Sequence, residues 1–158
     1  MLTHYTVVSA SACRQDHWLS PGTIQAVDIA LDSLEKRDRA KITEISLIGI
    51  SDGSLGVIAY SMWGKRKIAN RTLISSFGET LGPAAQVARL PQMQNGQWRF
   101  IQGGNDRLYP TEASIPWIQD FCQNVGTKCD LKFDPQGEHD WSYWQNNHKD
   151  WILEFFSK

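Results

Sequence analysis

The sequence lacks a long apolar run, a large net charge and a concentrated basic patch. A membrane-spanning helix needs about 20 consecutive apolar residues, and no segment of this chain provides them. The formal net charge is −1, and the basic residues are scattered. We therefore expect neither a nucleic-acid nor a membrane partner. The first residues also lack a basic segment followed by an apolar core, which predicts a cytoplasmic protein.

Cysteine is scarce, and its spacing matches no metal site. The three cysteines, Cys13, Cys122 and Cys129, form no CxxC pair, so we expect no metal ion. Reduced thiols are the default expectation. A Cys122–Cys129 bridge across a helix-to-strand turn is the alternative that the sequence leaves open.

The chain has no repeat, low-complexity segment or linker, and strand and helix patterns alternate along it. Residues 1–158 are therefore expected to form a single domain. The predicted strands are 5–9, 45–49, 71–75, 98–101 and 129–133. One predicted helix starts at Ser20-Pro21, and three more cover residues 54–63, 84–89 and 115–125. A further helix near the end of the sequence carries Trp144, His148, Trp151 and Phe155 on one side. This alternation predicts an α/β fold, a three-layer sandwich with a mainly parallel sheet of about five strands.

A serine between two glycines stands where the second predicted strand meets a helix, in Gly49-Ile50-Ser51-Asp52-Gly53. A sharp strand-to-helix turn pushes the Ser51 hydroxyl out of the sheet, and bulky residues at positions 49 and 53 would collide with adjacent backbone. The N-terminus of the following helix offers the N–H of Asp52 to a developing oxyanion.

Asp106 and His139 follow the fourth and fifth predicted strands. Since the loops at the carboxyl ends of parallel strands meet at one edge, the order Ser51, Asp106, His139 predicts a catalytic triad. The alternatives without a catalytic role are that Ser51 caps the helix, that Asp106 is a turn residue and that His139 is a surface histidine. Weaker rivals are the acids Asp130 and Asp134 and the bases His4, His17 and His148, of which His148 is expected to be a partly buried, hydrogen-bonded imidazole.

From about Thr43 to its end, the chain resembles the carboxyl-terminal half of an α/β-hydrolase. The segment "GEHDWSYWQNN" is similar to the histidine loop of the esterase D-like group, which includes S-formylglutathione hydrolases and feruloyl esterases. Trp141 and Trp144 stand where that group has aromatic residues. The resemblance implies Ser51 as nucleophile, His139 as base and Asp106 as the orienting acid, with no cofactor.

The chain departs from this family at its N-terminal side, because only about 45 residues precede the nucleophile turn. We therefore expect a minimal or truncated α/β-hydrolase fold in which strand 5–9 lies beside the nucleophile strand. Ala10 would then supply the second oxyanion donor, although an ordinary loop is an equal alternative. The open sheet edge is a candidate surface for a homo-oligomer.

The predicted function is hydrolysis of a small-molecule carboxylic ester by a serine esterase. Trp18 and Trp141 are the candidate substrate-binding residues, and Trp144 is expected in the core. The alternatives are a thioesterase or acyltransferase with the same triad, or a catalytically silent binding or scaffold protein.

Overall fold

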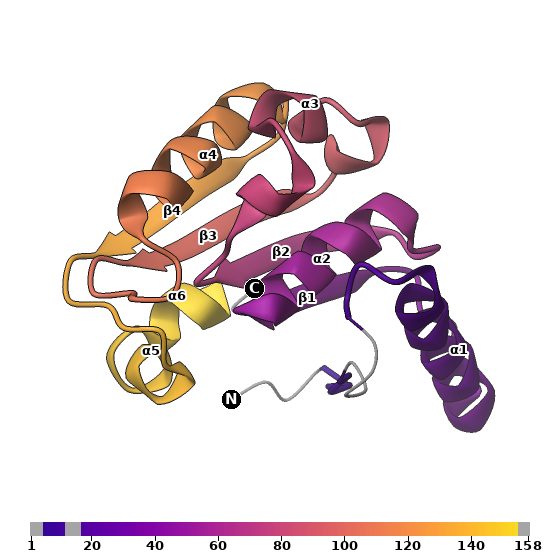
Figure 1. Cartoon of the computed structure of the whole chain (residues 1–158). Helices are drawn as coiled ribbons and strands as arrows, with labels where there is room; N and C mark the ends of the chain where they lie inside the picture. Colours follow the sequence, from indigo (N-terminus) through magenta and orange to yellow (C-terminus); the bar gives the residue numbers. More distant parts are fainter. Residues whose placement is uncertain (1–4, 12–16, 155–158) are drawn as a thin grey trace.

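Four parallel strands form the central sheet in the computed structural model, which describes residues 5–11 and 17–154 (Figure 1). The strands lie side by side in chain order: β1 (Ile45–Ile50), β2 (Ile68–Ile74), β3 (Gln97–Gly103) and β4 (Cys129–Asp134). Because every pairing is parallel, all four strands end at the same edge.

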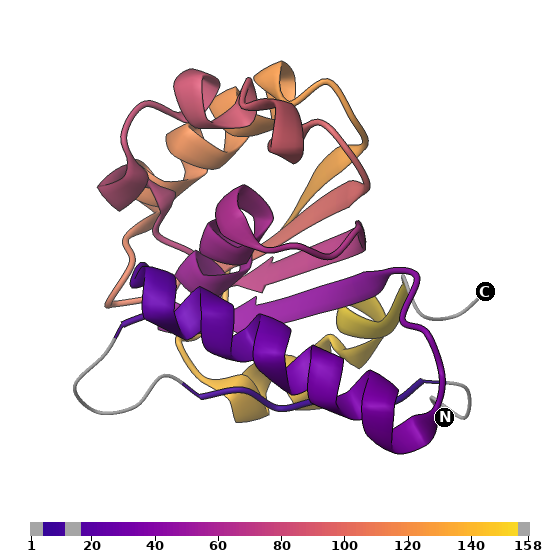
Figure 2. The same ribbon diagram turned by 90° about the vertical axis from the view of Figure 1, so that its right-hand side faces the viewer.

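Helices cover both faces of this sheet, as Figures 1 and 2 show. The strand order advances in one direction, so right-handed crossovers place the connecting helices α2, α3 and α4 on a single face. The opposite face carries α5 and α6, and α1 packs against α2. The helices are α1 (Pro21–Asp38), α2 (Asp52–Trp63), α3 (Ala84–Ala88), α4 (Thr111–Asn124), α5 (Trp141–Asn147) and α6 (Lys149–Leu153), with short 3₁₀ turns η1 (Gly78–Leu81) and η2 (Pro91–Met93).

The strands send alternate side chains to the two faces, which is why two cores form. Leu73 and Phe100 point into the core beneath α2, α3 and α4, whereas Ile74 and Ile101 meet Trp144 beneath α5 and α6. Trp144 is fully buried, as the sequence predicted. A parallel sheet flanked by helices is thus confirmed as the fold class. None of the described helices has the length and apolar composition needed to cross a bilayer.

The predicted strand at 5–9 is wrong, so the described sheet has four strands rather than about five. Val7 is 74% exposed and Val8 46% exposed, so their β-branched side chains have no core to cover. Strand propensity depends on such burial. Consequently β1 is an edge strand, and Ile48 on it remains 43% exposed.

The last predicted helix is divided in two at His148, whose φ of −137° is not helical. His148 ends α5 and precedes α6. Three residues named in the sequence interpretation, His4, Cys13 and Phe155, lie outside the described residues.

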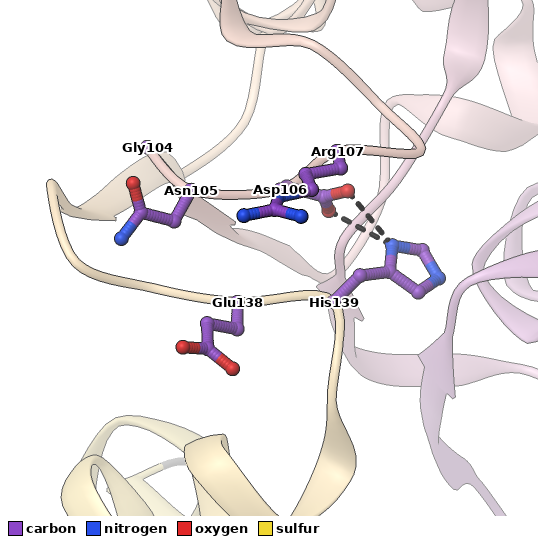
Figure 3. Close-up of a pocket in the computed structure, with 6 residues that line it drawn as sticks. All are labelled: Gly104, Asn105, Asp106, Arg107, Glu138 and His139. Atoms are coloured by element: carbon purple, nitrogen blue, oxygen red, sulfur yellow. Dashed lines mark hydrogen bonds and ion pairs between the residues drawn. The ribbon is translucent and has the colours of Figure 1, made fainter.

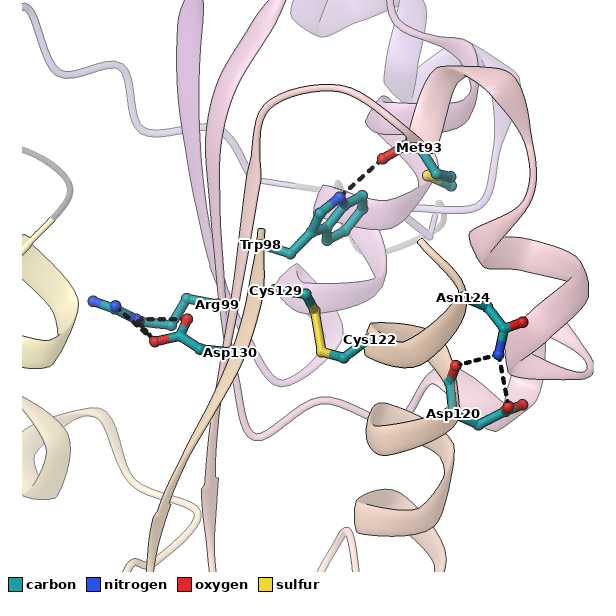
Figure 4. Close-up of a disulfide and its surroundings, with 8 residues drawn as sticks. All are labelled: Met93, Trp98, Arg99, Asp120, Cys122, Asn124, Cys129 and Asp130. Atoms are coloured by element: carbon teal, nitrogen blue, oxygen red, sulfur yellow. Dashed lines mark hydrogen bonds and ion pairs between the residues drawn. A yellow bond between two sulfur atoms is a disulfide. The ribbon is translucent and has the colours of Figure 1, made fainter. Parts of the chain in front are cut away.

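Cys122 and Cys129 form a disulfide (Figure 4). For these two cysteines the structure therefore has the bridge and not the reduced thiols of the default expectation. Cys122 lies near the end of α4, and Cys129 is the first residue of β4. The bond therefore closes the turn at the edge of the sheet opposite the strand ends.

We predict that Cys129→Ser lowers the free energy of unfolding by about 2 kcal/mol, because the bond closes a short loop of the unfolded chain. Denaturant titration with and without reductant measures this difference. The reductant should destabilise the parent protein but leave Cys129→Ser unchanged. Equal stability of parent and variant without reductant would contradict a formed disulfide.

Candidate active site

Three strand ends carry the predicted site residues to one edge of the sheet. Ser51 follows β1, Asp106 lies in the loop after β3, and His139 in the loop after β4. The register aligns Ile50 with Ile74 and Ile74 with Ile101, so the loops begin at the same level. Residues far apart in the chain therefore become neighbours.

Ser51 has a strained backbone at the turn from β1 to α2. Its φ of 55° and ψ of −126° are rare for a residue with a side chain. The turn is held by the Ser51 N–H, which donates to the Ile74 carbonyl at 2.9 Å. The buried Ser54 hydroxyl contacts the carbonyls of Gly49 and Ile74, joining the ends of β1 and β2.

Ser51, His139 and Asp106 form one continuous hydrogen-bonded chain. The Ser51 Oγ lies 2.8 Å from Nε2 of His139. Nδ1 on the other side of that ring lies 3.0 and 2.9 Å from the Asp106 carboxylate oxygens. An ionised carboxylate only accepts hydrogen bonds, so Nδ1–H donates to Asp106 and the Nε2 lone pair faces the serine.

Backbone hydrogen bonds hold the Asp106 carboxylate in addition to its contact with His139. Its Oδ1 accepts the backbone N–H groups of Leu108 and Tyr109 at 3.0 and 2.9 Å. The Asp106 side chain is fully buried, whereas 15% of the His139 side chain is exposed. The acid is therefore shielded from solvent while the imidazole remains reachable, which suits an acid that orients a base.

A polar cavity of about 630 Å³ lies between the loops that carry Asp106 and His139 (Figure 3). In Figure 3 the Arg107 and Glu138 side chains project on the far side of the His139 ring from its Nε2. The cavity is lined by Gly104, Asn105, Asp106, Arg107, Glu138 and His139. Its charged lining suits a polar rather than a purely apolar ligand.

Two aromatic residues that the sequence interpretation missed lie beside the His139 imidazole. The Tyr109 ring meets the His139 ring edge-on, with centroids 4.9 Å apart. Phe77, from the loop after β2, stacks on Tyr109 at 5.2 Å. Neither residue belongs to a sequence motif. Only their positions after β2 and β3 could have indicated that they lie near the site.

The two tryptophans predicted to bind substrate are not among the six residues that line the cavity. Trp18 packs on α2, where a Cβ at Gly56 would lie 2.7 Å from its ring. Trp141 begins α5 and is 42% exposed. A cleft position for either residue is thus not supported by this cavity.

The two predicted oxyanion donors differ in their structural basis. Asp52 is the first residue of α2, where backbone N–H groups have no partner within the helix. Ala10 is exposed, and the strand that was to place it beside Ser51 is absent from the described sheet. Its role therefore has no support from strand pairing and stays a prediction.

Three of the rival residues, Asp130, Asp134 and His148, have partners outside the predicted triad. Asp130 pairs with Arg99 at 2.8 Å, and Asp134 with His148 at 2.6 Å, which confirms the expected hydrogen-bonded state of His148. His17 is exposed and does not line the cavity. Within residues 5–11 and 17–154, no group of three or more His, Cys, Asp or Glu residues could hold a metal ion.

Solved structures with a similar fold include an α/β serine hydrolase homologue and an esterase, at low sequence identity. SOBER1 from Arabidopsis thaliana is 16% identical, with a TM-score of 0.61, over 87% of this chain and 64% of that chain. An α/β serine hydrolase homologue from Coxiella burnetii is 16% identical, with a TM-score of 0.59, over 96% of this chain and 64% of that chain. A truncated carbohydrate esterase from gut microbiota is 16% identical, with a TM-score of 0.57, over 90% and 69%.

The chain therefore has the fold of the α/β hydrolases and spans about 64% of the length of SOBER1. No protein-family model matches the sequence, and a comparison with curated proteins found no match. The likeness is one of fold, since the identities are near 16%. Activity has to be argued from the site itself.

The two glycines of the serine turn differ in what a side chain would meet, which corrects part of the sequence interpretation. A Cβ at Gly49 would lie 2.1 Å from the Gly53 carbonyl oxygen, but one at Gly53 would meet nothing within 4 Å. We predict that Gly49→Ala lowers the free energy of unfolding by about 1–3 kcal/mol because backbone must move apart.

Gly53→Ala is the matched control, and we expect it to be neutral or slightly stabilising because alanine favours the helix. Thermal unfolding of both variants measures the difference. Equal melting temperatures for the two variants would contradict the close approach at Gly49.

Proposed function

We propose that this chain is a serine hydrolase that cleaves carboxylic esters through an acyl-enzyme intermediate. The observation that carries the proposal is the hydrogen-bonded chain from the Ser51 hydroxyl through both nitrogens of His139 to the Asp106 carboxylate. The strained Ser51 backbone adds support, because such strain concentrates at functional sites.

In this mechanism, His139 Nε2 accepts the proton of the Ser51 hydroxyl as Oγ attacks the ester carbonyl. Asp106 keeps the proton on Nδ1 and stabilises the imidazolium that forms. The developing oxyanion accepts the Asp52 N–H, and the predicted second donor is the N–H of Ala10. The histidine then gives its proton to the leaving alcohol, and water repeats the sequence to release the acid. No step requires a cofactor.

The choice of an ester over other acyl compounds rests on resemblance. The loop around His139 is similar to that of the esterase D-like group, and one of the solved structures of similar fold is a carbohydrate esterase. A thioester or another acyl acceptor would use the same residues, so a panel of ester, thioester and peptide substrates distinguishes these reactions.

A silent binding protein with this fold is the remaining alternative, and the buried acid argues against it. A scaffold gains nothing from enclosing the Asp106 carboxylate and aligning it with an imidazole and a hydroxyl, since burial of a charge costs free energy unless it is paired. Covalent labelling by a fluorophosphonate separates the two, because only an activated serine reacts.

We predict that Ser51→Ala abolishes hydrolysis of p-nitrophenyl acetate and fluorophosphonate labelling while the melting temperature stays nearly unchanged. The substitution removes the nucleophile but leaves the turn and the His139–Asp106 pair intact. Ser33→Ala, on the exposed side of α1, is the control and should retain full activity. Retained turnover in Ser51→Ala would reject Ser51 as the nucleophile.

We predict that Asp106→Asn folds normally but loses roughly 10⁴-fold in kcat. The amide oxygen can still accept the N–H groups of Leu108 and Tyr109, which places the amide NH₂ against Nδ1 of His139. A donor there selects the tautomer with its proton on Nε2, which cannot accept the serine proton. Steady-state kinetics and circular dichroism measure both parts, and near-normal kcat would contradict the role of Asp106.

A further inference from the structure

A second histidine–aspartate pair lies at the start of the loop that carries His139. The Asp134 Oδ2 accepts hydrogen bonds from Nε2 of His148 and from the Tyr143 hydroxyl, both at 2.6 Å. The Asp134 Oδ1 accepts the Gln136 N–H at 2.9 Å. One carboxylate thus joins the end of β4 to α5 and to the residue between α5 and α6.

This carboxylate is mostly buried and ionised. Only 15% of the Asp134 side chain and 19% of the His148 side chain are exposed. The hydrogen bond from Tyr143, with a further one from His148, lowers the pKa of Asp134. The same bond raises the pKa of Tyr143 to about 12, so its hydroxyl remains a donor.

The backbone of the same residue joins the His139 loop to the Asp106 loop. The Asp134 carbonyl accepts the N–H groups of Gly104 and Gly137 at 2.8 and 2.9 Å. The Gly137 carbonyl in turn accepts the Asn105 N–H at 2.9 Å. The two loops that hold the acid and the base are therefore bonded to each other just before each reaches its side chain.

The backbone at Gly137 packs closely against Trp144 and Gly103. A Cβ at Gly137 would lie 2.4 Å from the Trp144 ring and 2.7 Å from the Gly103 Cα. Trp144 itself is fully buried in α5. Gly137 is thus enclosed between the end of β3 and α5, and Asp134 links α5 to the loop that contains Gly137.

His148 acts in this arrangement as an anchor rather than as a base. Its ring stacks on Trp151 of α6, with centroids 3.8 Å apart. In the described residues, the only hydrogen bond shown for its ring goes to Asp134, and no serine or cysteine side chain bonds to it. The pair has no nucleophile to activate, but it holds both α5 and α6 against the loop.

We propose that Asp134, His148 and Tyr143 form an anchor that positions the loop of His139 relative to Ser51 and Asp106. These three are positioning residues, and the inference rests on the proposed hydrolase function. A shift of about 1 Å in a catalytic group can cost two orders of magnitude in rate. The anchor would therefore contribute to turnover without touching the substrate.

The test compares Asp134→Ala with Asp130→Ala in the same strand. Asp130 is also a partly buried acid, but it pairs with Arg99 away from the triad. We expect Asp134→Ala to lower kcat per fluorophosphonate-titrated serine about 10- to 100-fold with KM nearly unchanged. Asp130→Ala should lower the melting temperature but keep kcat per titrated serine.

A milder pair of variants covers the case in which Asp134→Ala fails to fold. His148→Gln can still donate a hydrogen bond to Asp134 and should keep most of the kcat. His148→Leu cannot donate this bond, and its kcat should fall as in Asp134→Ala. Amide hydrogen exchange of residues 136–139 should be faster in His148→Leu than in the parent protein and unchanged in His148→Gln and Asp130→Ala.

Three outcomes would overturn the anchor: unchanged kcat per titrated serine in both Asp134→Ala and His148→Leu, an equal loss in Asp130→Ala, or equal losses in both His148 variants. Absence of labelling in the parent protein would instead reject the proposed function. Amide hydrogen exchange of residues 136–139 would then test the anchor by itself, and unchanged protection in His148→Leu would reject it.

Discussion

The parallel register of the four strands is the constraint on which the rest of the structure depends. Because Ile50, Ile74 and Ile101 pair across β1, β2 and β3, the segments that follow these strands start at one level. Gly103 and Asp134 pair in the same way at the ends of β3 and β4. A hydroxyl, a carboxylate and an imidazole can then meet although dozens of residues separate them. The one-directional strand order also sends every crossover helix to one face, which leaves the other face free for α5 and α6.

Much of this arrangement could be predicted from the sequence, because it depends on local patterns. The apolar run before Gly49 and the small residues after Ser51 specify a strand, a tight turn and a helix over a short stretch of chain. Asp106 and His139 were found by counting strands. The strand at 5–9 failed for the opposite reason: its residue types favour a strand, but strand formation also needs a partner and a covered face, which composition does not reveal.

The remaining features could not be predicted because they are contacts between side chains of different elements. Nothing local to Tyr109 or Phe77 shows that their rings stack beside an imidazole. The spacing of Cys122 and Cys129 permits a bond, but only the meeting of α4 and β4 decides it. The sequence reading set Asp134 aside as a weaker candidate for the catalytic acid. Its actual partners, His148 and Tyr143, lie on elements whose approach depends on packing around Trp144.

The two histidine–aspartate pairs show how the choice of ring nitrogen separates chemistry from support. His139 meets its acid through Nδ1, so Nε2, at the far end of the ring, is directed at the Ser51 hydroxyl and can exchange its proton. His148 uses Nε2 itself for Asp134, and the face of its ring is covered by Trp151. The Nε2 atom of that imidazole is therefore already hydrogen-bonded, and the ring links the end of β4 to α6. In the functions proposed for them, the first pair would transfer a proton and the second would hold the loop of His139 in position, although both consist of the same residue types.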